Sequence, residues 1–324
     1  MTESTQTTNA TVGGVDVEDL HIAYPTAVGK TSVVRGVSFA VAAGQTLAIV
    51  GESGAGKSLT ARSLLGLLPA PTYVAAGAVN VAGTDVVQAD PRAMRRLRGG
   101  LVGFIPQDPM SALNPVRRIG VIFHEVLSRH SQLSGKLRHE HISNVLTGVG
   151  LTHDVLSCYP HELSGGMKQR ILIALALVTE PSVIVADEPT TALDATVQAQ
   201  ILELLSDRIA GRVALILITH DLGVAATVCE RIAIMYAGRI VETGSTRSLL
   251  ERPRHPYTRG LLAAAPDFSE GAGLIPIPGS PPRPTQIPTG CAFAPRCSRP
   301  DELCQTMPEL DAADRGVACW HPFD

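Results

Sequence analysis

The sequence predicts an α/β fold with a parallel sheet at its centre. One apolar stretch, QTLAIVG, runs straight into the glycine-rich turn GESGAGKS at residues 51–58, and a helical pattern follows the turn. Two later stretches, SVIVADEP and RVALILITH, are continuous apolar runs of strand length. Such runs are typical of strands buried on both faces of a parallel sheet. Strand, glycine turn and helix in this order form the context in which such a turn binds phosphates.

The remaining elements can be placed in order by their periodicity. VDVEDLHIAY and SVVRGVSFAV precede the turn and have β-like patterns, SLTARSLLGLL follows it as a helix, and LVGFIPQ is a further short strand candidate. Residues 108–179 change to helical periodicity, as in VIFHEVLSRH and HISNVLTGVG, and predict an inserted helical subdomain. The stretch TVQAQILELLSDRIAG predicts a helix between the two apolar strands, with Gly211 as its C-terminal stop.

Composition limits the kinds of protein that this chain can be. It has 324 residues, of which 45% are hydrophobic and 18% charged, and a formal net charge of −3, which gives no general reason to expect a nucleic-acid partner. The longest apolar run, ILIALALV, is far shorter than the ~20 residues of a membrane-spanning helix. The start, MTESTQTTNATVGG, lacks the basic-then-apolar order of a secretory signal and predicts a disordered tail over residues 1–14 of a cytosolic protein.

We therefore expect one nucleotide-binding domain at residues 15–250 and a separate extension at residues 251–324. From Pro276 to the end the chain has ten prolines, and four of its six cysteines lie in the same stretch. In a reducing compartment, six cysteines argue against a disulfide scaffold.

The turn GESGAGKS has the residues that a nucleotide triphosphate needs. Its glycines let backbone N–H groups approach the phosphates, Lys57 can reach the β- and γ-phosphates, and Ser58 can bind Mg²⁺. The predicted nucleotide-binding residues here are Gly51, Glu52, Ser53, Gly54, Ala55, Gly56, Lys57, Ser58 and Leu59.

An acidic pair at the end of the run VIVADE supplies the second half of the predicted site. Asp187 can hold the Mg²⁺ shell, and Glu188 beside it can polarise an attacking water. The alternative, an acidic pair that caps the next helix, is less favoured because parallel strands deliver ligand-binding groups at their carboxyl ends.

Together with these motifs, LSGGM at residues 163–167 and DEPTTALD at residues 187–194 give the chain its resemblance to the ATP-binding cassette (ABC) family, over roughly residues 15–250. The resemblance implies the P-loop NTPase cassette fold, with a RecA-like core, an antiparallel β subdomain and the inserted helical subdomain. It also implies that Gln107 senses the γ-phosphate and Mg²⁺, that His220 contacts the γ-phosphate and that Tyr24 stacks on adenine. The simpler alternatives are that Gln107 is a loop residue, that His220 is a polar group at a helix N-terminus and that Tyr24 is an aromatic at a strand edge.

The same resemblance explains why the chain has two glycine-rich turns. In this family two cassettes pair head to tail, so Ser164, Gly165 and Gly166 of one chain close over the triphosphate that the other chain holds. Asp194 is expected in the loop that crosses to the partner. Met167 stands where the family more commonly has Gln, a variation associated with its peptide-importer members.

Other cassette proteins fit less well. The DNA-repair type places a very long coiled coil between the two turns, but Lys57 and Ser164 lie only 107 positions apart. The translation type has two cassettes in one chain, and this sequence has one. A cassette-derived regulator without turnover would tolerate the loss of Glu188, which is retained here.

Two further segments, QDPMSALNP at residues 107–115 and RHPYTRGLL at residues 254–262, resemble the D-type ATPases of bacterial oligopeptide, dipeptide and nickel importers. This resemblance covers nearly the whole chain and implies an ATP-hydrolysing peptide-importer subunit on the cytoplasmic face of the inner membrane. Its implied partners are a homologous F-type cassette, two permease subunits and an extracytoplasmic binding protein. A coupling helix of the permease is expected to face the first segment, residues 107–115. Nickel or another small solute is the alternative cargo.

Two short stretches are assigned no chemistry of their own. His255, Pro256 and Tyr257 predict a proline-started helix that packs an aromatic side chain. RAMRRLR at residues 92–98 could be a lipid or RNA patch, but the run is short and has no aromatic, so a solvated helical face is favoured.

The four cysteines of the extension suggest a metal centre. Cys291, Cys297, Cys304 and Cys319 lie in a proline-rich segment with little apolar content to offset its ordering entropy, and a metal would stabilise it. Four thiolates suit an iron–sulfur cluster or a structural zinc, although the absence of CxxC spacing weakens a zinc ribbon. The importer resemblance points to a [4Fe–4S] cluster, with zinc or four unligated thiols as alternatives and His321 as a spare ligand. Cys158 and Cys229 are expected to be small core residues.

Overall fold

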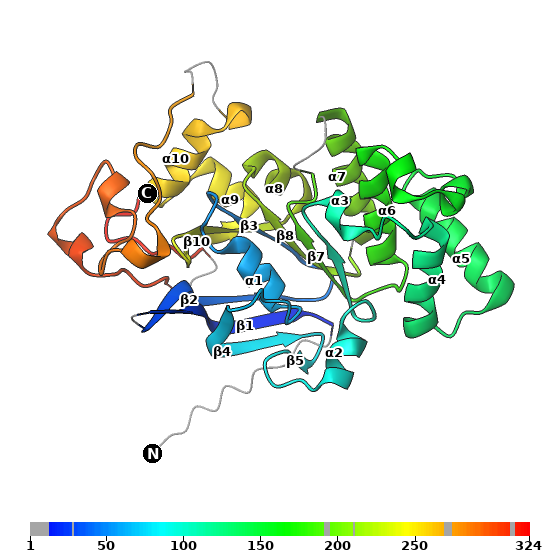
Figure 1. Ribbon diagram of the computed structural model, residues 1–324. Coiled ribbons are helices and arrows are strands. Elements are labelled where there is room, and N and C mark those ends of the chain that lie inside the picture. The colour runs from blue at the N-terminus through cyan, green and yellow to red at the C-terminus, as the bar shows by residue number, and fades with distance from the viewer. Residues whose placement is uncertain (1–12, 28, 191–194, 210, 269–273, 312–314) are drawn as a thin grey trace.

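The computed structural model describes residues 13–27, 29–190, 195–209, 211–268, 274–311 and 315–324. Two sheets occupy the middle of the molecule, a helical lobe lies at one end and the C-terminal extension lies at the other (Figure 1). The predicted Asp194 and most of the predicted tail fall outside the described residues. Within the described part of the chain, no helix is both long and apolar enough to cross a membrane.

The first sheet is antiparallel, with strand order β2-β1-β4-β5. Its strands are β1 (Val15–Thr26), β2 (Gly29–Val41), β4 (Tyr73–Val81) and β5 (Thr84–Asp85). The apolar side chains of β1 and β2 pack on helix α1 (Lys57–Ser63) and on one face of the second sheet. This sheet therefore forms a layer over the helix that follows the glycine-rich turn.

The second sheet has the order β10-β9-β3-β8-β7-β6 and is parallel except for β10. Its strands are β3 (Thr46–Val50), β6 (Val102–Ile105), β7 (Val183–Asp187), β8 (Ala214–Thr219), β9 (Arg231–Tyr236) and β10 (Arg239–Ser245). Alternate side chains of β7 enter different cores, since Val183 and Val185 face the antiparallel sheet whereas Ile184 and Ala186 face the opposite side. Every residue of β7 and β8 is buried, as the continuous apolar runs predict.

The helical lobe is inserted between β6 and β7. It contains α3 (Pro109–Ala112), α4 (Ile119–His130), α5 (Gly135–Gly148), α6 (Gly165–Leu177) and the short 3₁₀ turns η1 (His153–Ser157) and η2 (Pro160–Glu162). Outside the lobe lie α2 (Pro91–Leu97), α7 (Ala195–Ile209) and α8 (Leu222–Val228). The side chains of Phe123, Ile142 and Ile171 are fully buried and join the lobe to the sheet core.

Helix α9 (Thr246–Glu251) leads into the extension, which contains α10 (Pro256–Ala264) and the 3₁₀ turns η3 (Pro266–Phe268), η4 (Pro284–Gln286), η5 (Ala294–Arg296) and η6 (Glu302–Gln305). As predicted, Pro256 starts α10 and Tyr257 is fully buried. The carboxylate of Glu242, on β10, accepts hydrogen bonds of 2.8 Å from the backbone N–H groups of Arg254 and His255.

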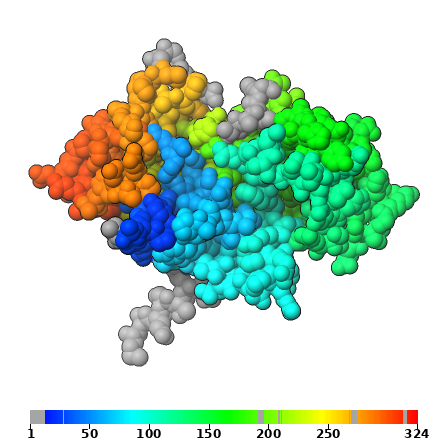
Figure 2. Space-filling view, viewed as in Figure 1, coloured from blue at the N-terminus to red at the C-terminus, as the bar shows by residue number. Residues whose placement is uncertain are grey.

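The end of the chain also returns to the sheet. A β-bridge pairs Glu242 with Val317, and the N–H of Ala318 donates to the carbonyl of Val241 at 2.8 Å. Figure 2 shows the extension packed against the region of β1 and β2. The predicted division at residue 250 stays a prediction, but residues on both sides of it share one hydrophobic core.

The two remaining cysteines have different surroundings. Cys229 is 5% exposed and follows α8 in the core, as expected, and burial strongly raises the pKa of its thiol. Cys158 follows η1 and is half-buried.

Candidate nucleotide-binding site

The glycine-rich turn connects β3, an inner strand of the second sheet, to α1 (Figure 1). Gly54 and Gly56 have φ angles of 81° and 104°, in the left-handed region that favours glycine. An added Cβ at Gly51 would lie 2.1 Å from the carbonyl oxygen of Met235 on β9, so the loop approaches the neighbouring strand closely. These glycines let the backbone wrap around the start of α1, where its free N–H groups can face an anion.

Lys57 and Ser58 stand at the start of α1 and reach different partners. The Lys57 Nζ donates to the carbonyl oxygens of Gly51 at 2.7 Å and Glu52 at 3.1 Å. Burial lowers the pKa of Lys57, whereas the carboxylates of Glu188 and Asp187 oppose that change. The lysine is therefore held beneath its own loop, with carboxylates close by.

Ser58 joins the loop to the end of β7. Its hydroxyl donates to Asp187 Oδ1 at 2.9 Å. Burial raises the pKa of Asp187, and the hydrogen bond from Ser58 opposes the rise. A hydroxyl and a buried carboxylate in contact form an oxygen pair of the kind that Mg²⁺ prefers, and the cation would supply the positive charge that the carboxylate needs.

Glu188 contacts two of the other predicted residues, Gln107 and His220. Gln107 Nε2 donates to Glu188 Oε2 at 3.1 Å, and His220 Nδ1 lies 3.3 Å from the same oxygen. The backbone of Glu188 has a φ of 47°, which is uncommon for a non-glycine residue and typical of functional sites. Three side chains from different strand ends thus meet beside the glycine-rich turn.

The second glycine-rich turn lies in the helical lobe. Ser164 caps α6, where its hydroxyl accepts a hydrogen bond from the N–H of Met167 at 3.3 Å. Ser164 and Gly165 are exposed, and an added Cβ at Gly165 would meet nothing within 4 Å. Gly166 is half-buried beside Val197 of α7. The turn thus presents the N-terminus of a 13-residue helix to the surface.

Tyr24 is half-buried on β1, opposite Thr31 of β2. An added Cβ at Gly56 would lie 3.3 Å from Val34 on the same β2 strand, so this strand pair borders the glycine-rich turn. The predicted loop residue Ser53 is exposed, whereas Ala55 is buried and its carbonyl accepts from the N–H of Gly238 at 2.9 Å. Leu59 packs against the core beneath the antiparallel sheet.

Sequence reasoning missed two residues that contact the glycine-rich turn. The hydroxyl of Tyr257 accepts a hydrogen bond of 2.9 Å from the backbone N–H of Glu52. Arg296 donates two hydrogen bonds to the Glu52 carboxylate, at 2.6 and 2.9 Å. These partners lie 205 and 244 positions from Glu52, so no local pattern indicates either contact.

The cysteines of the extension are all free thiols. The N–H of Cys291 donates to the carbonyl of Cys304 at 2.9 Å. Burial is the main cause that raises the pKa of Cys319, and the other three thiols raise it further. The four predicted ligands therefore lie within electrostatic range of one another.

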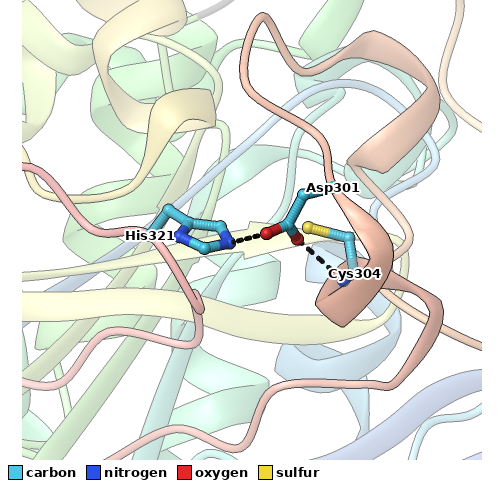
Figure 3. A group of neighbouring side chains, drawn as sticks. All are labelled: Asp301, Cys304 and His321. Carbon is cyan, nitrogen blue, oxygen red and sulfur yellow. Dashed lines mark hydrogen bonds and ion pairs between the residues drawn. The ribbon is translucent and has the colours of Figure 1, made fainter.

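A group that can hold a metal ion lies at the same place. Asp301, Cys304 and His321 offer ligand atoms within 4.8 Å of one another (Figure 3). His321 Nε2 lies 2.7 Å from Asp301 Oδ2, and the carboxylate side chain of Asp301 also caps the turn that contains Cys304. The spare ligand that the sequence indicated, His321, is thus beside Cys304.

Comparison with known proteins agrees with this geometry. A family model described as ABC transporter matches residues 34–191, and one described as oligopeptide/dipeptide transporter, C-terminal region, matches residues 241–304. The dipeptide transport ATP-binding protein DppD of Bacillus subtilis is 44% identical over 314 residues, which are 94% of each chain. The oligopeptide transport ATP-binding protein OppD of Salmonella typhimurium is 42% identical over 316 residues, 96% of this chain and 94% of that protein.

The chain belongs to the ABC transporter family. A solved dimeric ATP-binding cassette, bound to ADP and phosphate in a post-hydrolysis state, covers 72% of this ABC ATPase and 99% of its own chain, at a TM-score of 0.65 and 26% identity. The predicted cassette fold is confirmed, with its antiparallel sheet and inserted helical lobe. The match at residues 241–304 places the ABC ATPase among the oligopeptide/dipeptide transporter proteins.

Proposed function

We propose that the chain is the motor subunit of a peptide importer and that the groups converging on Glu188 perform its ATP hydrolysis. The observation that carries the proposal is the meeting of Gln107 and His220 on one carboxylate, next to the Ser58–Asp187 pair. To polarise a water, hold a metal and contact a γ-phosphate at one place, such groups must lie close together.

In this mechanism the glycine-rich turn holds the triphosphate with backbone N–H groups, and Lys57 moves from its own loop carbonyls to the β- and γ-phosphates. Ser58, Asp187 and Gln107 would hold Mg²⁺, which would neutralise negative charge on the phosphates. Glu188 orients and polarises the attacking water, and His220 donates to the γ-phosphate as negative charge develops. Tyr24 stacks on the adenine.

The exposed signature turn completes the site of a partner. Ser164 and Gly165 lie exposed at the N-terminus of α6, and a helix N-terminus stabilises negative charge. Placed over the triphosphate of a second cassette, it supplies donors on the open side of that site and excludes water. We therefore propose head-to-tail pairing with a homologous F-type cassette, with Asp194 in the loop that crosses between them.

The names of the relatives support the transport role. DppD and OppD carry dipeptide and oligopeptide transport in their names. We propose that the pair of cassettes lies on the cytoplasmic face of the inner membrane beneath two permease subunits, which a peptide-binding protein supplies from outside. Residues 107–115 follow β6 and lead into the helical lobe, where Met110 is 65% exposed and accessible to a permease helix.

Reconstitution tests this function. The chain, its partner cassette, the permease subunits and the binding protein are placed in vesicles, and ATP-dependent uptake of labelled di- and oligopeptides is compared with uptake of nickel. Peptide uptake that is lost with Lys57→Ala is expected. Uptake of nickel without peptide would contradict the peptide assignment and leave the ATPase assignment standing.

For the extension we propose that Cys291, Cys297, Cys304 and Cys319 hold a [4Fe–4S] cluster. The four cysteines are half-buried, and burial raises the pKa values of Cys291, Cys297 and Cys319, so their thiolates need a positive partner. A cluster binds through four thiolates and would stabilise a segment with little regular structure.

Metal analysis tests the cluster. Anaerobically purified full-length chain should contain about four irons and four acid-labile sulfides per molecule, and Cys297→Ser should lose both. Zinc in place of iron would contradict the cluster and would favour a site at Asp301, Cys304 and His321 with a further thiolate. The variant Cys158→Ser, outside the extension, is the matched control.

A further inference from the structure

The C-terminal extension is joined to the glycine-rich turn by hydrogen bonds of Tyr257 and Arg296 to Glu52. All three polar groups of Glu52 are occupied: its N–H by Tyr257, its carbonyl by Lys57 and its carboxylate by Arg296. The extension therefore holds the residue whose carbonyl receives the catalytic lysine. Any shift of Glu52 changes where Lys57 is held.

The contact with Arg296 is a part-buried, two-point ion pair. The Arg296 side chain is 5% exposed and that of Glu52 is 26% exposed. Arg296 is itself fixed, since its Nε donates to the carbonyl of Pro278 at 2.8 Å and a terminal nitrogen lies 3.3 Å from the hydroxyl of Tyr236. Its guanidinium also lies 5.9 Å from the ring centre of Phe293. A guanidinium held at this many points is well placed to orient a carboxylate.

The charge of this pair matters for an anionic ligand. Glu52 is close enough to Lys57 to influence the charge on the lysine. Without Arg296, the Glu52 carboxylate would compete with a triphosphate for Lys57 and would repel the phosphates directly. Arg296 counters both effects because its positive charge neutralises the carboxylate that it contacts at two points.

We propose that Arg296 is a positioning residue for ATP binding: the extension sets the nucleotide affinity of the ABC cassette through the Arg296–Glu52 ion pair. The inference rests on the proposed role of the glycine-rich turn in binding ATP. It assigns the C-terminal extension a part in the ATPase site of its own chain, with the tyrosine contact to the Glu52 N–H as a second support.

The test measures ATP affinity of the full chain by equilibrium binding of a fluorescent ATP analogue. Arg296→Met should raise the dissociation constant about tenfold, within the range typical of coupling between contacting sites. Arg296→Lys keeps the charge but loses the two-point geometry, so its effect should be intermediate. Arg283→Met, at an exposed arginine of the same extension, is the matched control and should bind like the wild type.

A double variant separates charge from packing. Glu52→Gln combined with Arg296→Met removes both charges, and its affinity should return to within about threefold of the wild type. A double variant as weak as Arg296→Met alone would assign the effect to packing and overturn the proposal. Wild-type ATP affinity in Arg296→Met would also overturn the proposal.

Kinetics of the assembled importer give a second readout. Arg296→Met should raise the KM for ATP and leave kcat within about twofold, because the hydrolytic groups around Glu188 are untouched. A loss of folded protein would instead lower kcat. If Arg296→Met does not fold, Arg296→Lys and Tyr257→Phe carry the test, and wild-type affinity in both would overturn the proposal.

Lys57→Ala separates this inference from the proposed function. If Lys57→Ala binds ATP as the wild type does, the glycine-rich turn is not the ATP site and the proposed function fails. If Lys57→Ala loses binding while Arg296→Met keeps it, only the positioning role of Arg296 fails.

Discussion

The two glycine-rich turns of this ABC ATPase begin helices in similar ways but have opposite surroundings. The turn at residues 51–58 is enclosed by its own chain, with Lys57 only 5% exposed and Glu52 fixed by the extension. The turn that starts at Ser164 is exposed and opens onto the surface of the helical lobe. The difference teaches that one turn is assembled within the chain, whereas the other is accessible to a second chain, as the proposed pairing requires.

The largest expected effect tests the enclosed turn. Glu188→Gln should lower ATP turnover in the assembled transporter about 1,000-fold, because the amide cannot polarise water, while ATP binding persists. Single-turnover hydrolysis and nucleotide binding are measured side by side. Glu203→Gln, an exposed glutamate of α7, is the control. Unchanged hydrolysis in Glu188→Gln would remove Glu188 from the mechanism.

The next effect tests the exposed turn. Ser164→Ala should leave ATP affinity of its own chain unchanged but lower turnover at the partner's loop about 100-fold, the usual cost of losing one donor to developing charge. Turnover is measured in an assembled pair in which Lys57→Ala silences this chain's own loop. Ser134→Ala, which changes the exposed N-cap serine of α5 in the same lobe, should have no effect. An equal loss in the two serine variants would contradict the pairing.

A smaller effect concerns the metal at the enclosed turn. Ser58→Ala removes the hydroxyl that contacts Asp187 and should raise the Mg²⁺ concentration for half-maximal hydrolysis about tenfold. Ser58→Thr retains a hydroxyl and should stay close to the wild type. Mg²⁺ titrations of ATPase activity decide between the two, and equal curves for both variants would exclude Ser58 from the metal site.

The smallest effect on activity is expected where the extension attaches to the rest of the fold. The effect on stability there should nevertheless be measurable. Burial lowers the pKa of His255 to about 4, while the unfolded chain has a value near 6.5. Between these values the unfolded state binds the extra proton, so His255 destabilises the fold as pH falls from about 6.5 to about 4. The loss should reach about 2 kcal/mol by pH 4.5.

Urea unfolding at pH 7 and pH 4.5, followed by the fluorescence of the single tryptophan, Trp320, measures this loss within the extension. His255→Gln cannot titrate, so the difference between its stabilities at the two pH values should be smaller than in the wild type by about that amount. Parallel changes in the two proteins would show that His255 does not contribute.

The sequence by itself predicted a parallel sheet with a glycine-rich turn, because these depend on local order, and the family resemblance of its motifs implied the rest of the cassette fold. A strand, a glycine-rich turn and a helix are adjacent in the chain, and the buried runs around Asp187 reveal a parallel sheet. The sequence left β4 and β10 unassigned because their patterns are mixed and sheet pairing completes them. It also left β9 unassigned, although its apolar run is as long as that of β8.

Only the tertiary structure decided which distant groups meet. Gln107 lies 81 positions from Glu188, and Arg296 lies 244 positions from Glu52, yet each pair is in contact. Such contacts depend on how the sheets and the extension pack, and packing is a property of the whole chain that no local pattern carries. For this reason the sequence could treat the extension as a separate appendage, whereas the fold makes it part of the surroundings of the nucleotide loop.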